Sequence, residues 1–541
     1  MEFPKTLGDT RLAMRSFLSP APQVKITNAF ARPFDNLVAT ARTCYSAKGI
    51  VSDDDVAGPP GADPALLADK AAARDQLAVG LYRAGHHTTL QHAHFQFAIS
   101  NVSRHFIWSF LHSHPFYNSE QVSQRYVAVK PGAYAVPPLE GFGLDAFHAT
   151  VAAQNEAYAA LTDSLTARVQ REYFRRFPAR GRSPEAWRKE IHKKAQEAAR
   201  YVLPVATFAH LYHTISGLTL LRYYRTCGQF DTPLEQRIVL EKMVEEILEH
   251  EPSYRSILEE PLPPEATIEY QVFQSTISPD GGRARFLREF DEDLGGLTSR
   301  LVDYPARNQE TLAQAVREIF GLSRDRMSDE EAIALALDPS RNRWLGETLN
   351  TTTHTKLSRA LFHAHYTFRK KLSHTADSQN QRHRMTPASR PILAAHFSGE
   401  PDYITPAIIA AEPKALSIYA RAMERSWEGI ARLKSLGVED EFALYLLPNA
   451  AAVRFTESSD LLNLRHKMAM RLCYNAQEEI WLASLQEARQ ISEVNPLVGK
   501  YLLPPCTLRL MAKAYPICPE GKRFCGERVW TYSIDRYERV I

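Results

Sequence analysis

The stretch SQNQRHRMTPASR, from Ser378 to Arg390, places an arginine, a histidine and an arginine side by side in a segment with almost no apolar residues. Adjacent cations repel one another, so this clustering has a cost unless an anion or an electron-rich ring lies nearby. A pyrophosphate or a reduced, anionic flavin would supply the compensating charge. We interpret Arg382, His383 and Arg384 as a candidate anion site, with a solvated run of charges as the alternative.

The composition sets the broad class of the protein. The chain has 541 residues, of which 44% are hydrophobic and 23% charged, and this mixture is typical of a globular protein with several domains. A net charge of +3 argues against bulk nucleic-acid binding. No apolar run approaches the roughly 18 residues of a membrane span. With no signal-like N-terminus and only six cysteines, we expect a cytoplasmic protein.

Several features of the sequence occur twice. A His-Ala-His-aromatic-x-Phe unit begins at His92 and again at His363, and each is followed by a Leu-Pro step and a helical stretch ending on Arg225 or Arg471. This order predicts an internal duplication with a period of about 250 residues. Convergence of two unrelated helical domains is the alternative.

Hydrophobic periodicity predicts more helices than strands. HFQFAIS alternates like a strand, whereas AQEAARYVL, PLEQRIVLEKMVEEILEH and NAQEEIWLASLQEARQI have helical spacing. The Pro- and Glu-rich segment Leu258–Gln271 is typical of a linker. We expect an α+β fold in two repeats, an antiparallel sheet with packed helices in each, at 20–258 and 272–500, followed by a tail at 501–541.

NSEQVSQRYV, from Asn118 to Val127, gathers side chains suited to a phosphorylated nucleobase. Arg125 offers a planar fork for phosphate, and Gln121 and Gln124 can pair their amides with a base edge. Ser123 adds a rotatable hydroxyl. A polar surface loop is the alternative interpretation.

The tail contains Cys506, Cys518 and Cys525 near a Pro-Glu-Gly turn, and these could bind zinc together with a histidine. Their spacing matches no tight zinc knuckle, so we expect buried thiols and no metal. The histidine pairs that begin at His92 and His363 are likewise expected to be packing residues.

Together these stretches resemble the flavin-dependent thymidylate synthases, a family known for an Arg-His-Arg triplet followed, seven residues later, by Ser-x-Arg-Tyr. In the first half the triplet position is His112-Ser113-His114, whereas SQRY is present. In the second half the triplet is intact, but Ile392 stands where the serine is expected. Each half therefore keeps the part of the motif that the other has lost.

The resemblance implies a reaction, reductive methylation of dUMP to dTMP, with FAD as cofactor and NADPH and methylenetetrahydrofolate as co-substrates. It also implies roles for individual residues, with Ser123 and Arg471 as the catalytic pair. The implied dUMP-binding residues are Gln121, Ser123, Gln124, Arg125, Arg200, Gln379, Arg382 and Arg471. The implied FAD-binding residues are Thr88, Thr355, Arg382, His383, Arg384 and His466.

Family enzymes are homotetramers with sites shared between subunits, so the resemblance implies a homodimer of two-copy chains with about one FAD per chain. The rivals are a family member that acts on another pyrimidine nucleotide or transfers hydroxymethyl, and a non-catalytic flavin- or nucleotide-binding regulator.

Overall fold

The computed structural model describes residues 16–59, 61–113, 116–229, 231–276 and 282–539. These residues form two compact units, each of which draws on both halves of the sequence. Unit 1 takes in the described residues of 1–147, 205–278 and 432–446, and unit 2 takes in those of 148–204, 279–431 and 447–541. The two repeats expected at 20–258 and 272–500 divide the chain by sequence and not by these spatial units. Their boundaries stay a prediction.

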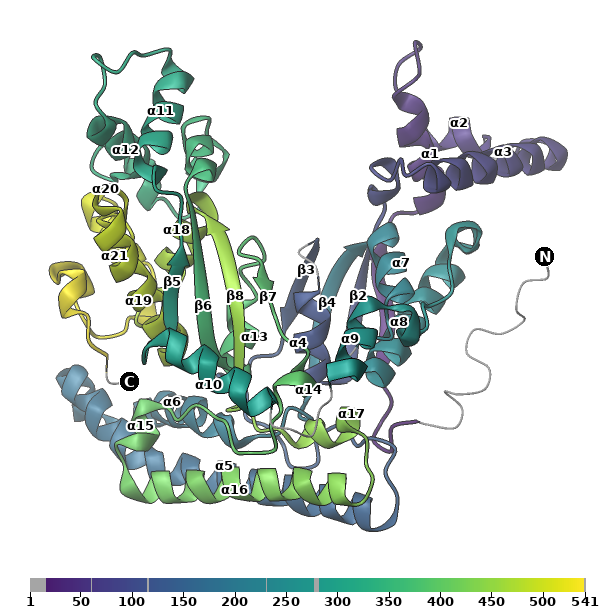
Figure 1. Ribbon diagram of the computed structural model, residues 1–541. Helices are drawn as coiled ribbons and strands as arrows, with labels where there is room; N and C mark the ends of the chain where they lie inside the picture. Colours follow the sequence, from purple (N-terminus) through teal and green to yellow (C-terminus); the bar gives the residue numbers. More distant parts are fainter. Residues whose placement is uncertain (1–15, 60, 114–115, 230, 277–281, 540–541) are drawn as a thin grey trace. The chain divides into compact units, whose positions relative to one another are not determined.

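Unit 1 is built around a four-stranded antiparallel sheet in the order β1-β2-β4-β3 (Figure 1). Its strands are β1 (Gln23–Ala29), β2 (His94–Ser103), β3 (Tyr117–Gln121) and β4 (Phe208–Ser216). Its helices are α1 (Pro33–Thr43), α2 (Asp53–Ala57), α3 (Pro64–Arg83), α4 (Arg104–His112), α7 (Gly217–Arg225), α8 (Pro233–His250), α9 (Ile268–Thr276) and α17 (Asp440–Ala443).

The core of unit 1 lies between β2 and α8. Phe95, Phe97 and Ile99 point to one face of the strand because side chains alternate along it, and they are buried. Val239 and Met243 of α8 belong to the same cluster. The alternating stretch and PLEQRIVLEKMVEEILEH thus form the strand and the helix that their periodicities predict.

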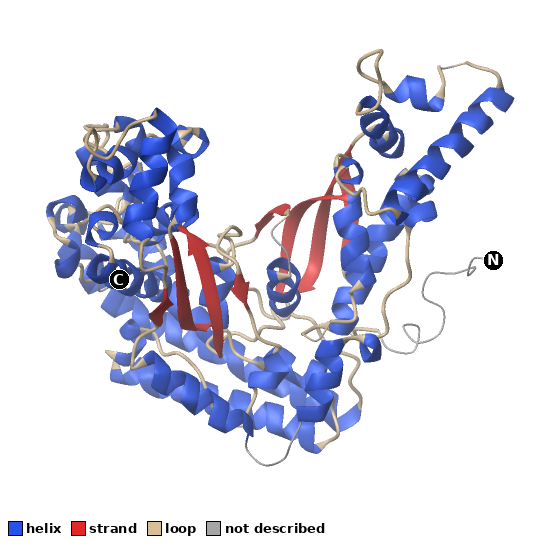
Figure 2. Cartoon of the chain, turned by 45° about the horizontal axis from the view of Figure 1, so that its top comes forward, coloured by secondary structure: helices blue, strands red, loops and turns tan. Residues whose placement is uncertain are grey.

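Unit 2 contains a second four-stranded antiparallel sheet, and the strands of both sheets are red in Figure 2. Its strand order is β5-β6-β8-β7 (Figure 1). Its strands are β5 (Ser299–Asp303), β6 (His365–Ser373), β7 (Ala388–Ser389) and β8 (Ala452–Asp460). The helices of its C-terminal part are α18 (Leu461–Arg471), α19 (Glu478–Val494), α20 (Pro496–Gly499) and α21 (Pro505–Met511). The others are α6 (Arg188–Ala199), α10 (Gly282–Leu294), α11 (Asn308–Phe320), α12 (Asp329–Leu337), α13 (His374–Asn380), α14 (Leu393–His396) and α15 (Ala407–Ala410).

Two long helices, α5 (Gly141–Arg176) and α16 (Pro413–Ser435), lie side by side in unit 2 over most of their length. The amide of Gln154 donates to the Ser426 hydroxyl at 2.9 Å. Gly429 allows this approach, since a Cβ there would lie 2.3 Å from the Thr150 hydroxyl oxygen. The helices bring residues from both halves of the sequence into one core.

The same buried carboxylate motif occurs in each unit. In unit 1 Glu235 accepts hydrogen bonds from the backbone and hydroxyl of Ser103 and from the Tyr445 hydroxyl, all at 2.6 Å. In unit 2 Glu479 accepts from Ser373 and, at 2.7 Å, from the Tyr201 hydroxyl. Each tyrosine comes from the opposite half of the sequence from its glutamate.

The structure corrects the expected linker in part, because Ile268–Gln271 forms the first turn of α9. Mixed helix with antiparallel sheet is confirmed as the fold class. None of the described helices combines the length and hydropathy that a bilayer span requires.

Candidate functional site

The Arg-His-Arg triplet of unit 2 follows directly after the short helix α13. Ser373 caps this helix by accepting from the Ala376 amide, and Gln381 ends it. Arg390, the last residue of the stretch, donates two hydrogen bonds to Asp377 of α13, at 2.7 and 2.9 Å. Because both partners are buried, this pair fixes the loop that carries the triplet.

The histidines of the site are neutral, so its positive charge resides on arginines. Burial holds the pKa of His383 well below its usual value, and the nearby Arg471 and Lys467 lower it further. The His466 ring lies 6.0 Å from the His383 ring. Partial burial lowers the pKa of His466 as well, with Arg465 and Arg471 adding to the effect.

A chain of hydrogen bonds connects the predicted pyrimidine contacts. Arg471 donates to the backbone carbonyl of Gln379 at 2.9 Å, and the Gln379 amide donates to Gln477 at 2.5 Å. The Gln477 amide in turn donates to the Tyr201 hydroxyl at 2.6 Å. Unit 2 thus brings Gln379 and Arg471 into direct contact.

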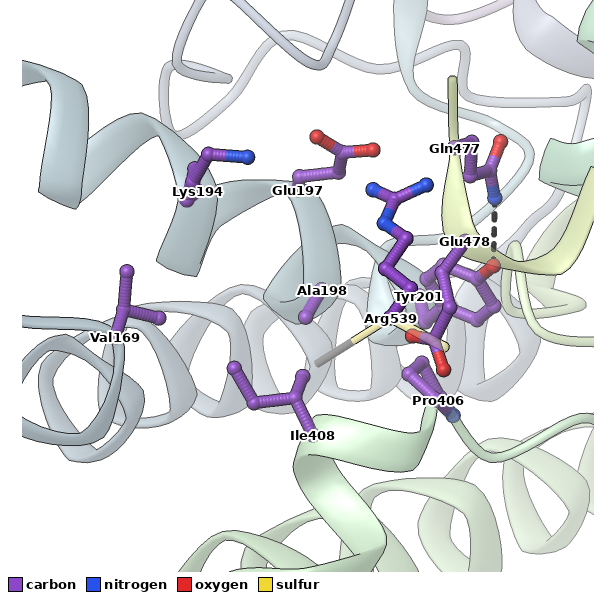
Figure 3. A pocket seen from close by; sticks show the side chains of 10 residues that line it. All are labelled: Val169, Lys194, Glu197, Ala198, Tyr201, Pro406, Ile408, Gln477, Glu478 and Arg539. Carbon is purple, nitrogen blue, oxygen red and sulfur yellow. Dashed lines mark hydrogen bonds between the residues drawn. The ribbon is translucent and has the colours of Figure 1, made fainter. Parts of the chain in front are cut away.

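This chain ends at a pocket of unit 2, shown in Figure 3, where the dashed line joins Gln477 to Tyr201. Two cations and two carboxylates line it, together with apolar groups: Val169, Lys194, Glu197, Ala198, Tyr201, Pro406, Ile408, Gln477, Glu478 and Arg539. Burial raises the pKa of Glu478, and Arg539 opposes the shift. Arg200, one of the predicted dUMP-binding residues, directly precedes Tyr201 in unit 2 and is 3% exposed.

Beneath α13 lies a cluster of four buried charges, which we call the ionic quartet: Lys370, Glu457, Lys467 and Glu487. All four side chains are at most 1% exposed. The amide of Asn380, at the end of α13, donates to Glu457 at 2.7 Å. The quartet therefore supports the helix that presents the triplet.

Unit 1 contains the predicted nucleotide loop. Arg104 donates to the Gln121 amide oxygen at 2.9 Å and to the Val122 carbonyl at 2.5 Å, which holds the loop at the end of β3. The Ser123 hydroxyl accepts from the backbone N–H of Arg125 at 3.3 Å, and Gln124 is buried.

The remaining predicted residues are placed as follows. Thr88 is exposed in unit 1, and Thr355, in unit 2, shares a 2.9 Å hydroxyl–hydroxyl hydrogen bond with Ser358. The two units therefore divide the predicted set, with Thr88 and the nucleotide loop in one and the triplet with its partners in the other. In unit 1, His112 packs edge-on against Trp108 at 4.4 Å, and His114 lies outside the described residues.

Strand register corrects one comparison made from the sequence. The helices α7 and α18 begin after their N-caps at Ser216 and Asp460, which occupy the same register position in β4 and β8. Counted from these caps, the counterpart of Arg471 is Cys227 and not Arg225. The late arginine is therefore specific to the second half.

Unsatisfied polar atoms beside the triplet suit a ligand rich in hydrogen-bonding groups. Neither amide atom of Gln381 has a hydrogen-bond partner among the described residues, although both are buried. The same holds for the Nε2 atom of His383. Buried polar groups without a partner are costly, so a bound group that supplies donors and acceptors fits this position.

Comparison with known proteins identifies the family. The family model described as thymidylate synthase complementing protein matches residues 25–253 and 300–497. The flavin-dependent thymidylate synthase of Sulfurisphaera tokodaii is 31% identical over 153 residues, which span 27% of this chain and 58% of the relative. The protein of the same name from Thermococcus kodakarensis is 26% identical over 245 residues, or 42% of this chain and 91% of the relative. In Geobacter sulfurreducens the identity is 28% over 171 residues, or 31% and 70%.

All three relatives have the name flavin-dependent thymidylate synthase. The chain belongs to the flavin-dependent thymidylate synthase family and contains two regions that match it. The match to the Sulfurisphaera protein spans less than two thirds of that protein's length.

Sequence reasoning missed several residues that hold the site together, namely Arg104, Tyr201, Gln477 and the ionic quartet. Tyr201 was detectable in principle, because Arg-Tyr precedes the Leu-Pro step in the first half and Leu-Tyr precedes it in the second. Gln477 and Lys370 carry no local signal, since their side-chain partners lie 87 or more residues away in the sequence. Glu457 and Lys467 are 10 residues apart, but they lie on a strand and on the helix after it.

Proposed function

We propose that this protein catalyses the reductive methylation of dUMP to dTMP, with FAD as cofactor, methylenetetrahydrofolate as carbon donor and NADPH as reductant. One observation carries the proposal. Unit 2 presents an intact Arg382-His383-Arg384 triplet close to Arg471, and Arg471 is hydrogen-bonded to Gln379. Family membership and the orphaned amide of Gln381 support the same assignment.

The flavin would supply the hydride, and the protein would supply position and charge. Arg382, Arg384 and His466 would hold the flavin. Because His383 and His466 are neutral, the electrostatic field comes from the arginines. The carbonyl of Gln379 fixes the Arg471 guanidinium, which would then stabilise the negative charge that develops on the uracil ring.

The nucleotide would be bound by Gln121, Gln124 and Arg125 together with Arg200. Ser123 would orient the pyrimidine and would not act as a covalent nucleophile. Its hydroxyl accepts a backbone hydrogen bond from Arg125, and activation of a serine requires an adjacent general base. The proposal thus uses residues of both units, so substitutions in either unit should abolish turnover.

The decisive experiment assays the purified full chain with dUMP, methylenetetrahydrofolate, NADPH and FAD. We expect dTMP to form, and we expect oxidation of the reduced flavin to depend on dUMP. Arg384→Ala should abolish both activities, whereas Arg188→Ala, at an exposed position outside the site, should leave them unchanged. Flavin binding without dTMP would refute the proposal and favour a regulator, and product only from a different nucleotide would redirect it to that substrate.

We further infer a cytoplasmic homodimer that binds about one FAD per chain and neither nucleic acid nor membrane. Only the second half has an intact triplet, which supports this stoichiometry. A flavin-to-chain absorbance ratio near two would contradict it.

A further inference from the structure

A cavity of unit 2, away from the triplet, is lined by four of the six cysteines of the chain: Cys473, Cys506, Cys518 and Cys525. They come from three places, namely the connection between α18 and α19, the start of α21 and the irregular tail. All four are free thiols. The fourth cysteine, Cys473, lies 33 residues before Cys506 in the sequence, so the spacing of the tail cysteines alone could not indicate it.

The tail segment that contributes two of these cysteines has very little regular structure. Between Ala512 and Arg539 its only helices are three single 3₁₀ turns. Tight backbone turns follow both cysteines: Gly521 has a φ of 53°, three residues after Cys518, and Gly526 has a φ of 89°, directly after Cys525. A Cβ at Gly526 would lie 2.7 Å from Phe177, so the second turn is also sterically fixed.

The thiol of Cys525 donates to the Glu527 carbonyl, with 3.7 Å between sulfur and oxygen. Two buried arginines also act on the cluster, Arg509 on Cys518 and Arg176 on Cys525. Nearby guanidinium groups stabilise thiolates, which are the form of cysteine that binds metal.

Neither simple packing nor redox chemistry accounts well for these features. Buried free cysteines are common as small apolar residues, but isolated packing does not explain why four converge while Cys44 and Cys227 lie apart in unit 1. A redox-active dithiol needs two cysteines, whereas four line this cavity.

We propose that the four cysteines form a structural Zn²⁺ site that anchors the tail to the connection between α18 and α19. Four thiolates in tetrahedral arrangement are a preferred zinc environment. As placed here, no three His, Cys, Asp or Glu side chains of the described residues form a ready ligand group. Zinc entry therefore turns the sulfurs inward, and each thiol that coordinates releases its proton to solvent. The two arginines then offset the excess negative charge of a tetrathiolate centre.

The test measures the metal content of the full chain, purified under reducing conditions from zinc-supplemented cells. We expect about one zinc per chain, released by a mercurial thiol reagent. Replacement by Co²⁺ should give the intense visible bands of a tetrahedral thiolate complex. Cys518→Ser and Cys525→Ser should lose the metal and lower the melting temperature, and Cys44→Ser should change neither.

A thiol count keeps the proposal testable even where a serine variant fails to fold. In the native wild-type protein a thiol reagent should modify the four cluster cysteines only after a chelator or a denaturant is added, and Cys44 should react at once. Absence of zinc with all four thiols reduced, or a disulfide among them by mass spectrometry, would overturn the proposal. None of these readouts depends on flavin or dTMP formation, so the zinc site and the proposed function can fail separately.

Discussion

Removal of one charge from the ionic quartet should strongly destabilise unit 2. The ammonium of Lys370 lies 2.5 Å from Glu457 and 2.7 Å from Glu487, while that of Lys467 contacts Glu457 and lies 3.8 Å from Glu487. The four charges cancel. Lys467→Met would leave two buried carboxylates with a single buried ammonium, and thus one uncompensated negative charge.

The magnitude follows from the distances and the burial. At 3.8 Å and an effective dielectric constant of about 20, the attraction between Lys467 and Glu487 is about 4 kcal/mol. Removal of one partner of a buried pair typically costs about 3–5 kcal/mol, because the other charge stays buried without compensation. The double variant Lys467→Met, Glu487→Gln restores neutrality with Lys370 and Glu457 still paired, and should recover most of the loss.

Unit 1 shows that this layer can be built without lysine or glutamate. Equivalent positions in the two units follow from strand register and from the buried glutamates Glu235 and Glu479. In unit 1 the residues equivalent to Lys370, Glu457, Lys467 and Glu487 are, in that order, Ile99, His213, Tyr223 and Met243. Those four residues are buried as well. Uncharged residues in place of Lys467 and Glu487 are therefore compatible with the fold, since Tyr223 and Met243 hold those positions in unit 1.

Urea unfolding of the wild type, the single variant and the double variant, followed by tryptophan fluorescence and far-ultraviolet circular dichroism, would measure these free energies. A double variant as unstable as the single one would refute the reasoning, because neutrality would then not be what the quartet provides. Since Asn380 donates to Glu457, the single variant should also bind FAD more weakly than the double variant.

Three further predictions concern single residues. Arg471→Ala should lower the rate of dTMP formation about 100-fold or more with little change in melting temperature, and near-normal turnover would exclude its proposed role. Burial, aided by Arg454, lowers the pKa of His396 to about 4. On acidification the imidazole of His396 binds a proton at a higher pH in the unfolded state than in the folded state, so a fall from pH 7 to pH 5 should cost about 2 kcal/mol of stability through this residue. Urea titrations at the two pH values should show a smaller loss for His396→Leu than for the wild type. Arg390→Lys should lower the free energy of unfolding by about 1–3 kcal/mol because lysine cannot reproduce the two-point contact with Asp377, and an unchanged value would contradict its clamping role.

Local patterns predicted the elements of this fold better than their assembly. The alternation around Phe95 and Phe97 predicted β2, and helical spacing predicted α8, because both signals lie within one element. The composition of the units was not predictable in this way. The contact between Tyr201 and Glu479 joins residues 278 positions apart, and no periodicity records such a pairing.

The sequence predicted those parts of the candidate site that lie in one contiguous motif. The comparison of residues between the two halves was wrong where it was counted from helix ends, because the helices differ in length. The triplet and Gln379 are neighbours in sequence, and the structure places them on one helix and its following loop. Arg225 was matched to Arg471 because each ends its helix. However, α7 has 9 residues and α18 has 11, so helix ends are a poor reference and the N-caps are a sound one.

Each half of the sequence supplies a tyrosine to the buried glutamate of the other half. These contacts explain how the first half can lack the Arg-His-Arg triplet and still be required for the fold. Burial raises the pKa of Glu235 and of Glu479, so each carboxylate depends on the hydrogen bonds that it accepts. One of these bonds comes from Tyr445 and Tyr201 respectively, across the two halves of the sequence. Loss of a tyrosine hydroxyl would leave a buried acceptor short of a donor, at a cost of about 1–3 kcal/mol. The histidine and serine at positions 112 and 113 take no part in these hydrogen bonds: Ser113 donates to the Ser109 carbonyl, and His112 packs on Trp108 with its Nε2 atom 3.9 Å from Asp231. The fold therefore constrains the buried tyrosines and glutamates of both halves, whereas it leaves the triplet position of the first half free to differ.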